Sequence, residues 1–531
     1  MLWTGSDDGW VQISQEAGKT WTNVTPKDLP EFARISMVEP SHYSASTVYL
    51  AANRFQMDDW TPYLYRSNDF GKTWTRITSG IDVRQFTRVI REDPVRRGLL
   101  FAGTEKGVWV SLNDGDNWQP LQKNLPPVPV HDLAIKEGDL VAGTHGRSFW
   151  ILDDISVLRQ VTTELLAKNA HVFQPRDPYR ESLGGGFGGG GGGQSPVGAN
   201  PPSGALVRYW LKSANQTVQV EITDAKGNLV RRFTSAQDST AAADSVRADS
   251  RRMARRDSLI KSGLSADSAA KRTPYVAPGG PAVASDDDDD VPFRTPRAPR
   301  VANKAGMNTF VWNFRYPEPA TFDGMILWAA GAQGPVAPPG KYTVKFTVGG
   351  EVLSRTFEVK KDPRLNATQA ELEEQFRVAM AVRDRFSDAN DAVKGVRGVR
   401  VQMTDRAPRL KGADSSLFVG IQQRFSTRMG GVEGEVYQVK NQSSQDPLNF
   451  PIKLNNKIGA LLGVVGAADG KPTAQSYEVF NFLSDSLENA ITTLRVIVND
   501  ELPRVNEILK RNGLQPVTAN IPGPKKVKFT P

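Results

Sequence analysis

The chain has 531 residues, a hydrophobic content of 39% and a formal net charge of +8, which predicts roughly three or four globular domains. It has no cysteine, so disulfides, thiolate metal sites and a cysteine nucleophile are excluded. Its four histidines argue against a metal centre, and its scattered basic residues argue against nucleic-acid binding. No apolar run is long enough to cross a bilayer. We therefore predict no metal, no cofactor, no nucleic-acid partner and no transmembrane segment.

Three short segments repeat in the first 120 residues, with the pattern Ser-x-[Asp/Glu/Asn]-x-Gly-x-[Thr/Asn]-Trp. They begin at Ser14, Ser67 and Ser111, so the period is 53 and then 44 residues. Strand-like runs precede each segment and a short one follows it, which predicts a four-stranded propeller blade with this box at its last turn. The box residues with a predicted structural role are Ser14, Glu16, Gly18, Trp21, Ser67, Asp69, Gly71, Trp74, Ser111, Asn113, Gly115 and Trp118.

The chemistry of these boxes points to a tight turn. Serine and aspartate oxygens accept backbone N–H groups, glycine permits a positive φ, and the tryptophan packs against the blade. We therefore interpret Asp69 and Glu16 as turn-stabilising rather than catalytic residues. A fourth unit, over residues 132–152, has three strand-like runs and no box.

The first strand-like run, residues 2–6, matches the second strand of the later blades, and the strand before it is missing. Fewer than four complete blades cannot close a ring, because propellers need roughly four to eight. We therefore expect further N-terminal blades, either lost from this chain or supplied by another one.

Ligands usually bind a propeller at the end opposite these boxes, where loops gather around the channel mouth. The insertion from Asn53 to Trp60 combines an arginine, paired carboxylates and an aromatic ring, as a sugar or peptide site requires. The weak catalytic candidates are Asp58 and Asp59. The ligand-binding candidates are Asp7, Asp8, Asn53, Arg54, Trp60, Glu105, Lys106, His145 and Arg147. The loops between blades add Asp28, Arg84 and His131.

The three boxes and the run Gly143-Thr-His-Gly-Arg-Ser-Phe-Trp-Ile-Leu-Asp-Asp154 carry a family resemblance. Residues 1–160 resemble the C-terminal portion of bacterial sortilin-type BNR (Asp-box) repeat β-propeller proteins, which are commonly labelled glycosyl hydrolases. The resemblance implies a secreted or periplasmic protein. The same box occurs in sialidases and xyloglucan-cleaving propellers, but the arginine triad, Tyr–Glu pair and acid aspartate of sialidases do not map onto this chain.

The rest of the chain predicts a multidomain fold that is mainly β and then α-helical. After the partial propeller of about three to four blades (1–160) we expect a linker with a glycine-rich run (161–205). An Ig-like β-sandwich follows (206–362), interrupted by a disordered insertion (235–304) that contains Asp286–Asp290. A helical bundle (363–515), opened by a capping box at Thr368, and a tail (516–531) complete the chain.

Three functions stay open at this point. The first is an exported propeller protein that recognises carbohydrate or peptide ligands through its loop face and is not catalytically complete. The second is a sialidase- or xyloglucanase-like glycoside hydrolase whose site is completed by the missing N-terminal blades. The third is a structural or oligomeric scaffold.

Overall fold

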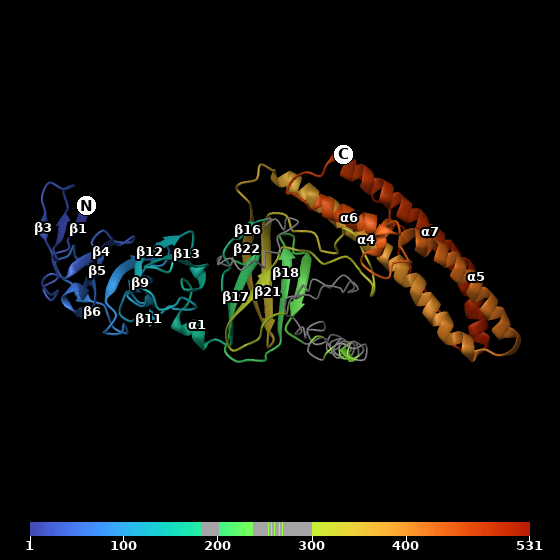
Figure 1. The fold of residues 1–531 in the computed structure, drawn as a ribbon, viewed down its shortest axis with the longest axis horizontal. Helices are drawn as coiled ribbons and strands as arrows, with labels where there is room; N and C mark the ends of the chain where they lie inside the picture. The colour runs from blue at the N-terminus through green and yellow to red at the C-terminus, as the bar shows by residue number, and fades with distance from the viewer. Residues whose placement is uncertain are drawn as a thin grey trace. The chain divides into compact units, whose positions relative to one another are not determined.

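The computed structural model describes residues 1–181, 201–236 and 300–530, with six isolated positions between 253 and 268. The chain forms two compact units, Met1–Arg176 with Ala199–Pro201, and Asp177–Gly198 with Pro202–Pro531. The predicted glycine-rich run, Asp286–Asp290 and most of the predicted insertion lie outside the described residues. Each unit is described below by itself (Figure 1).

The first unit contains four consecutive antiparallel sheets in which neighbouring strands follow one another along the chain. The first sheet has three strands: β1 (Leu2–Gly5), β2 (Val11–Ser14) and β3 (Thr22–Asn23). The second has four: β4 (Arg34–Pro40), β5 (Val48–Arg54), β6 (Asp59–Ser67) and β7 (Thr75–Arg76). The third has four: β8 (Thr87–Glu92), β9 (Leu100–Thr104), β10 (Gly107–Ser111) and β11 (Gln119–Pro120). The fourth has three: β12 (Val130–Lys136), β13 (Asp139–Thr144) and β14 (Phe149–Leu152).

These sheets are the meanders from which propeller blades are built. Their strands carry apolar residues on both faces, because each middle sheet is covered on both sides. In β5, the side chain of Leu50 belongs to the apolar cluster shared with the first sheet, whereas its neighbours Tyr49 and Ala51 belong to the cluster shared with the third. A third cluster, which includes Phe101 and Leu140, joins the third and fourth sheets. Burial of successive apolar layers therefore stabilises the stack of sheets.

Short elements follow the fourth sheet: η2 (Ile155–Val157), α1 (Thr163–Ala167) and β15 (Ala170–Val172). One side chain fixes this segment to the third sheet. Asp93, which is fully buried, receives two hydrogen bonds from Arg159 Nε, at 3.1 and 3.0 Å, and one from Arg159 Nη2 at 2.8 Å. A buried carboxylate is stable only when it is paired in this way.

In the described residues of the second unit there are two sheets and four long helices. One sheet includes β17 (Ala205–Leu211) paired with β20 (Gly306–Trp312). The other has the order β16 (Tyr179–Arg180), β22 (Glu351–Lys361), β21 (Gly340–Val348), β18 (Val218–Asp224) and β19 (Leu229–Thr234). Their aromatic side chains meet, since Trp312 lies 4.9 Å from Tyr342 and Tyr209 lies 4.8 Å from Phe346 between ring centroids. The two sheets thus share a core, and an Ig-like identity for them stays a proposal.

The helices are α4 (Gln369–Arg406), α5 (Gly412–Val436), α6 (Leu454–Val465) and α7 (Ala474–Arg511). The predicted capping box at Thr368 and Glu371 is confirmed. One apolar core joins the helices and includes Phe386, Phe418, Leu487 and Met325, the last from the loop between β20 and β21. A mainly β architecture with a C-terminal helical region is therefore confirmed. Among the described residues, no helix is long and apolar enough to cross a membrane.

Candidate functional site

The three boxes hold their own turns. In each box the serine Oγ accepts the N–H of the box glycine, at 2.8 Å for Gly18 and at 2.9 Å for both Gly71 and Gly115. In the second box Asp69 also accepts the Thr73 N–H at 2.9 Å. Hydrogen bonds from the Thr73 side chain and backbone hold the pKa of Asp69 below its usual value. The charge of Asp69 is therefore used within the turn.

The other two boxes vary this pattern. Asn113 accepts the Asn117 N–H at 3.0 Å, so an amide oxygen takes the place of the carboxylate. Glu16, which is one methylene longer, accepts the Thr20 hydroxyl at 3.3 Å. The indole of Trp118 donates to the Ile77 carbonyl at 2.7 Å, whereas Trp21 in the first box is 41% exposed.

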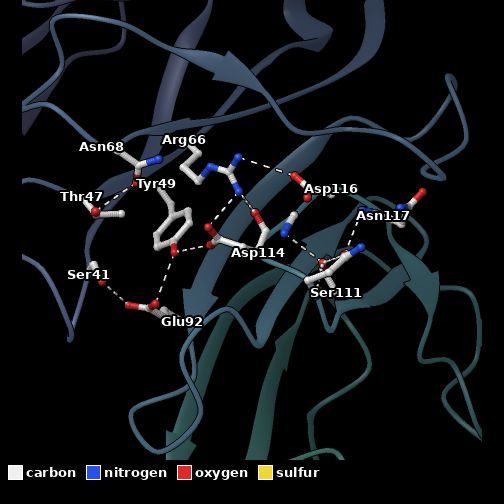
Figure 2. A network of polar contacts seen from close by, with 12 residues as sticks. Ser41, Thr47, Tyr49, Arg66, Asn68, Glu92, Ser111, Asp114, Asp116 and Asn117 are labelled. Carbon is white, nitrogen blue, oxygen red and sulfur yellow. Dashed lines mark hydrogen bonds and ion pairs between the residues drawn. The ribbon is translucent and has the colours of Figure 1, made fainter. Parts of the chain in front are cut away.

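A buried polar network joins the second and third sheets at the box side (Figure 2). Asp114, from the third box, accepts hydrogen bonds from the Tyr49 hydroxyl at 2.6 Å and from Arg66 Nη1 at 2.8 Å. The same hydroxyl lies 3.2 Å from Glu92, which also accepts the Ser41 hydroxyl at 2.7 Å. Burial and the bond to Asp114 raise the pKa of Tyr49, so the phenol stays protonated and donates. The carboxylates and the phenol at the box side are thus paired with one another, whereas Arg66 Nε has no hydrogen-bond partner among the described residues.

The opposite side of the sheets, which we call the loop side, has a repeated irregularity. The first strands β4, β8 and β12 each carry a β-bulge at the same place, where Ser36, Arg88 and His131 are the extra residues. The flanking residues pair with Ala51 and Ala52 of β5 in the second sheet. In the next two sheets they pair with the last two positions of the neighbouring strand, the Gly-Thr pairs ending at Thr104 and Thr144. A bulge redirects its side chain and is common beside binding sites.

In two of the three sheets the bulged residue contacts the residue that follows the neighbouring strand. Arg88 Nη2 forms an ion pair with Glu105 Oε2 at 2.8 Å. His131 stacks on His145, with ring centroids 4.9 Å apart and an interplanar angle of 27°. In the second sheet the Ser36 hydroxyl donates to the Ala51 carbonyl at 3.1 Å, and the residue equivalent to Glu105 and His145 is Asn53, which is buried within β5. One backbone geometry therefore presents two different pairs of side chains, in the third and fourth sheets.

An aromatic group adjoins the ion pair. Phe55, from η1 (Phe55–Met57), stacks on Phe86 with ring centroids 4.7 Å apart, and Trp60 meets Phe86 edge-on at 5.4 Å. The Arg88 guanidinium lies over both phenylalanine rings, 4.8 Å from Phe86 and 5.3 Å from Phe55. Phe86 is buried, whereas Trp60 is 46% exposed. We call the combined set the loop-side cluster: Phe55, Trp60, Phe86, Arg88, Glu105, His131 and His145.

The charges of this cluster are coupled. Burial, followed by electrostatic interactions with Arg88 and then His145, lowers the pKa of His131, while Glu105 opposes the shift. The imidazole of His131 is therefore held neutral near neutral pH. Among the described residues, Arg88 Nη1 and Glu105 Oε1 have no hydrogen-bond partner, so the ion pair keeps one donor and one acceptor for a ligand.

The structure brings Trp60, Glu105 and His145 together with residues that the sequence did not single out. The other candidates have local roles. Asn53 is buried at 3% exposure, and Arg54 donates to the Glu31 carbonyl at 3.0 Å. Asp58 caps η1 in the left-handed conformation, with φ of 58°.

Four further candidates also lie outside the cluster's ring and ion-pair contacts. Asp8 accepts the Ser6 hydroxyl, and Asp7 lies in the same turn. The Lys106 N–H donates to Thr104 Oγ1 at 3.3 Å, and the Arg147 carbonyl accepts the Trp150 indole at 2.8 Å. For all of the candidate residues, a role in ligand binding stays a prediction.

Asp59 is the best-placed carboxylate of the predicted insertion. It accepts the Tyr63 hydroxyl at 2.7 Å and the Thr61 N–H at 3.0 Å. Burial alone raises its pKa, but the hydrogen bonds from Tyr63 and Thr61 and the charge of Arg54 outweigh burial and lower it. Asp59 is therefore ionised and already hydrogen-bonded at neutral pH, a state suited to a base and unsuited to a general acid.

Sequence reasoning missed Phe55, Phe86 and Arg88, and placed His131 in a loop although it lies in β12. A bulge adds one residue to one strand without any fixed sequence pattern. The only available signal was the alignment of the strand pairs, which sets Thr87-Arg88 beside Val130-His131. Among the described residues no group of three or more His, Asp or Glu side chains is placed to hold a metal ion.

No family model and no curated protein matches the chain. Solved structures match parts of it. A structure of YCF48 bound to a D1 peptide shares 17% identity over 28% of this chain and 47% of its own length, with a TM-score of 0.23. A GH74 xyloglucanase from Xanthomonas campestris shares 16% identity over 33% of this chain and 29% of its own, with a TM-score of 0.24. A GH74 enzyme from Niastella koreensis shares 14% identity over 43% of this chain and 34% of its own length, with a TM-score of 0.24. The chain spans less than half of the length of each.

Proposed function

We propose that this chain is a recognition protein of the Asp-box β-propeller type, and that its loop-side cluster binds a carbohydrate or a peptide. The observation that carries the proposal is the repeated bulge. The third and fourth sheets present side-chain pairs from the same backbone position, and the pairs differ in chemistry: Arg88 with Glu105, and His131 with His145. A constant frame with variable side chains is how recognition surfaces are built on rigid scaffolds.

The chemistry of the cluster suits a polar ligand with an apolar face. Trp60, half exposed and supported by Phe86, offers a ring on which a sugar or a ring-bearing side chain can stack. Beside it, Arg88 and Glu105 offer one donor and one acceptor that are already held in place. The fixed ion pair reduces the entropy lost when a ligand binds.

The hydrolase alternative has less support from the geometry. Glycoside hydrolysis needs one carboxyl group with a raised pKa as general acid and a second carboxylate, about 5 to 10 Å away. Of the described carboxyl groups with a resolved shift, Asp388 has a raised pKa, and it lies in α4 of the helical region. Asp59 has a lowered pKa. Asp59 therefore does not fit the role of the general acid.

The test is binding of the full chain to an array of oligosaccharides and to a peptide library. We expect at least one ligand whose affinity falls about tenfold or more in both Trp60→Ala and Arg88→Gln. The matched control is Trp21→Ala, which removes an equally exposed tryptophan from the box side and should leave the affinity unchanged. Absence of any ligand, or an equal loss in the control, would contradict the proposal. Turnover of a reporter glycoside that Asp59→Asn abolishes would favour the hydrolase instead.

A further inference from the structure

The sheets of the first unit repeat at the level of single residues, which allows their exposed faces to be compared. We use "forward face" for the face that a sheet turns toward the next sheet along the chain. On the third strands of the second, third and fourth sheets, this face carries Leu64, Val108 and Phe149. Each of them pairs with an equivalent residue of the second strand, namely Ala51, Gly103 and Gly143.

Two residues further along, the same comparison gives Arg66, Val110 and Ile151, which pair with Tyr49, Phe101 and Val141. The next sheet covers this face in the second and third sheets. Leu64, Val108 and Val110 are 0%, 4% and 7% exposed. In the fourth sheet Phe149 is 79% exposed and Ile151 is 58% exposed.

The strand that carries these bare residues is well seated. The side chains of Trp150 and Leu152, which alternate with Phe149 and Ile151 along β14, pack against the apolar cluster between the third and fourth sheets. One face of β14 is therefore partly buried and the other presents two large apolar side chains to solvent. Such exposure is costly in water and marks a packing surface.

The glycines at equivalent positions of the second strands, Gly103 and Gly143, independently indicate whether the forward face of their sheet is covered. A Cβ added to Gly103 would lie 2.6 Å from Cγ1 of Val89 in its own sheet and 2.9 Å from both Cγ1 and O of Val130 in the next sheet, so the fourth sheet approaches this glycine too closely for a side chain. Gly143 occupies the equivalent position. A Cβ added to Gly143 would meet only its own sheet, at 3.6 Å from Phe149 and 3.7 Å from Asp132. The fourth sheet thus has room for a close neighbour.

From the second sheet on, the opposite face of each sheet covers the forward face of the sheet before it, and these covering faces share one pair of residue types. In the second, third and fourth sheets an aromatic residue of the third strand pairs with an aliphatic residue of the second strand: Tyr65 with Leu50, Trp109 with Ala102, and Trp150 with Ala142. The first sheet has Gln12 and Thr4 at these positions. Its outer face therefore lacks the aromatic–aliphatic pair that a second copy of this chain would have to offer to Phe149 and Ile151.

We propose that the forward face of the fourth sheet, formed by Val141, Gly143, Phe149 and Ile151, packs against a further antiparallel β-sheet. This partner sheet presents an aromatic residue on its third strand beside a small or aliphatic residue on its second. The inference extends the packing that already joins the second, third and fourth sheets, and it is independent of any ligand at the loop side.

The test places the photo-crosslinking residue p-benzoylphenylalanine at position 149 of the full chain, with the same residue at position 95 as a control. Phe149 and Val95 are both exposed, at 79% and 66%, so neither change should prevent folding, and Val95 lies outside the loop-side cluster and the fourth sheet. After irradiation in the cells that make the protein, mass spectrometry identifies the crosslinked peptides. The proposal predicts that position 149, unlike position 95, captures a segment with alternating apolar residues and the aromatic–aliphatic pairing described above.

Three results would overturn the proposal. The first is capture of residues 2–24 from a second copy, which would make the chain its own partner. The second is capture of residues 201–530 of the same chain, which would mean that its own second unit covers the face. The third is no capture at position 149, which would mean that the face is exposed in the functional protein.

Discussion

The two ends of the sheets in the first unit differ in how their polar groups are used. At the box side, Asp114, Tyr49, Arg66 and Glu92 bind one another, and the box serines bind the glycines of their own turns. At the loop side, the bulges present side chains that differ from sheet to sheet, and Trp60 and the paired histidines are exposed. At the box side similar residues form similar turns in the first three sheets. At the loop side the backbone has the same bulge in the last three sheets, but the side chains differ.

This difference assigns stability to the side chains of the box side and recognition to those of the loop side. Side chains whose hydrogen bonds are satisfied within the protein stabilise it and have little left to offer a ligand. Side chains that are held in place and still keep a free donor, acceptor or ring face can bind one. We therefore expect substitutions at the box side to lower the free energy of unfolding, and substitutions at the loop side to lower affinity.

The largest effect is expected from Asp114→Ala. This substitution removes one acceptor of the Tyr49 hydroxyl and one of Arg66, whose side chain is only 16% exposed. The hydroxyl keeps Glu92, and Arg66 keeps the Asp114 carbonyl and Asp116. The loss of two hydrogen bonds to a carboxylate should lower the free energy of unfolding by about 2 kcal/mol. Chemical denaturation of the two proteins measures this difference.

The matched control is Asp116→Ala. Asp116 is in the same turn and lies 3.5 Å from Arg66 Nη2, but its side chain is 62% exposed. A surface ion pair of this kind contributes less than about 0.5 kcal/mol. Equal losses of unfolding free energy in the two variants would show that the hydrogen bonds of Asp114 in Figure 2 stabilise the protein no more than a surface ion pair does.

A smaller effect is expected in the second box. Asp69→Ala removes the acceptor of the Thr73 N–H and should cost about 1 kcal/mol, as for a lost helix cap. Asp69→Asn should stay within about 0.5 kcal/mol of the wild type at pH 7, because Asn113 makes the equivalent bond in the third box. Thermal melting compares both variants with the wild type, and an equally large loss in both would contradict the turn-stabilising role.

The same residue predicts a pH dependence. The pKa of Asp69 is lower in the folded protein than its ordinary value of 3.8. Its carboxylate therefore contributes stability that is present above about pH 4 and is lost as the pH falls through the folded-state pKa. Melting curves of Asp69→Asn and the wild type should accordingly converge on acidification. The contribution is small because the side chain is solvated.

The smallest effect is expected at the loop side, on the titration of His131. Its pKa is lowered first by burial and then by Arg88 and His145. Arg88→Met removes one of these charges and should raise the pKa of His131, as followed by NMR of its ring protons. Because the folded-state pKa lies below the ordinary 6.5, the neutral ring favours folding fully above about pH 6.5, and this contribution declines as the pH falls below it. A pKa that stays constant or falls would mean that the two side chains do not interact.

Much of the fold could be predicted from the sequence because its signals are local. Each box combines serine, glycine and tryptophan at fixed spacing, and the Thr368 capping box is visible in four residues. The alternation of apolar residues located most strands. In contrast, the network around Asp114 joins residues up to 65 positions apart, and no local pattern marks such partners.

The candidate site was predictable only in part, for the same reason. The composition of the 53–60 insertion indicated Trp60, and the position after the second strand indicated Glu105 and His145. Arg88 resembled an ordinary strand residue, because the bulge that redirects it depends on its pairing with β9. Asn53 resembled a loop residue but is buried beside Arg34 in the sheet register.

The most direct test of the claim that the box side stabilises the protein and the loop side binds the ligand uses two variants and two measurements. Trp60→Ala changes the loop side and Asp69→Ala changes the box side, and each is compared with the wild type in ligand affinity and in free energy of unfolding. The predicted result is that Trp60→Ala loses about tenfold or more in affinity and stays within about 0.5 kcal/mol in stability. Asp69→Ala should lose about 1 kcal/mol in stability and bind as the wild type does. The reverse pattern, weakened binding in Asp69→Ala with unchanged binding in Trp60→Ala, would contradict the assignment of recognition to the loop side.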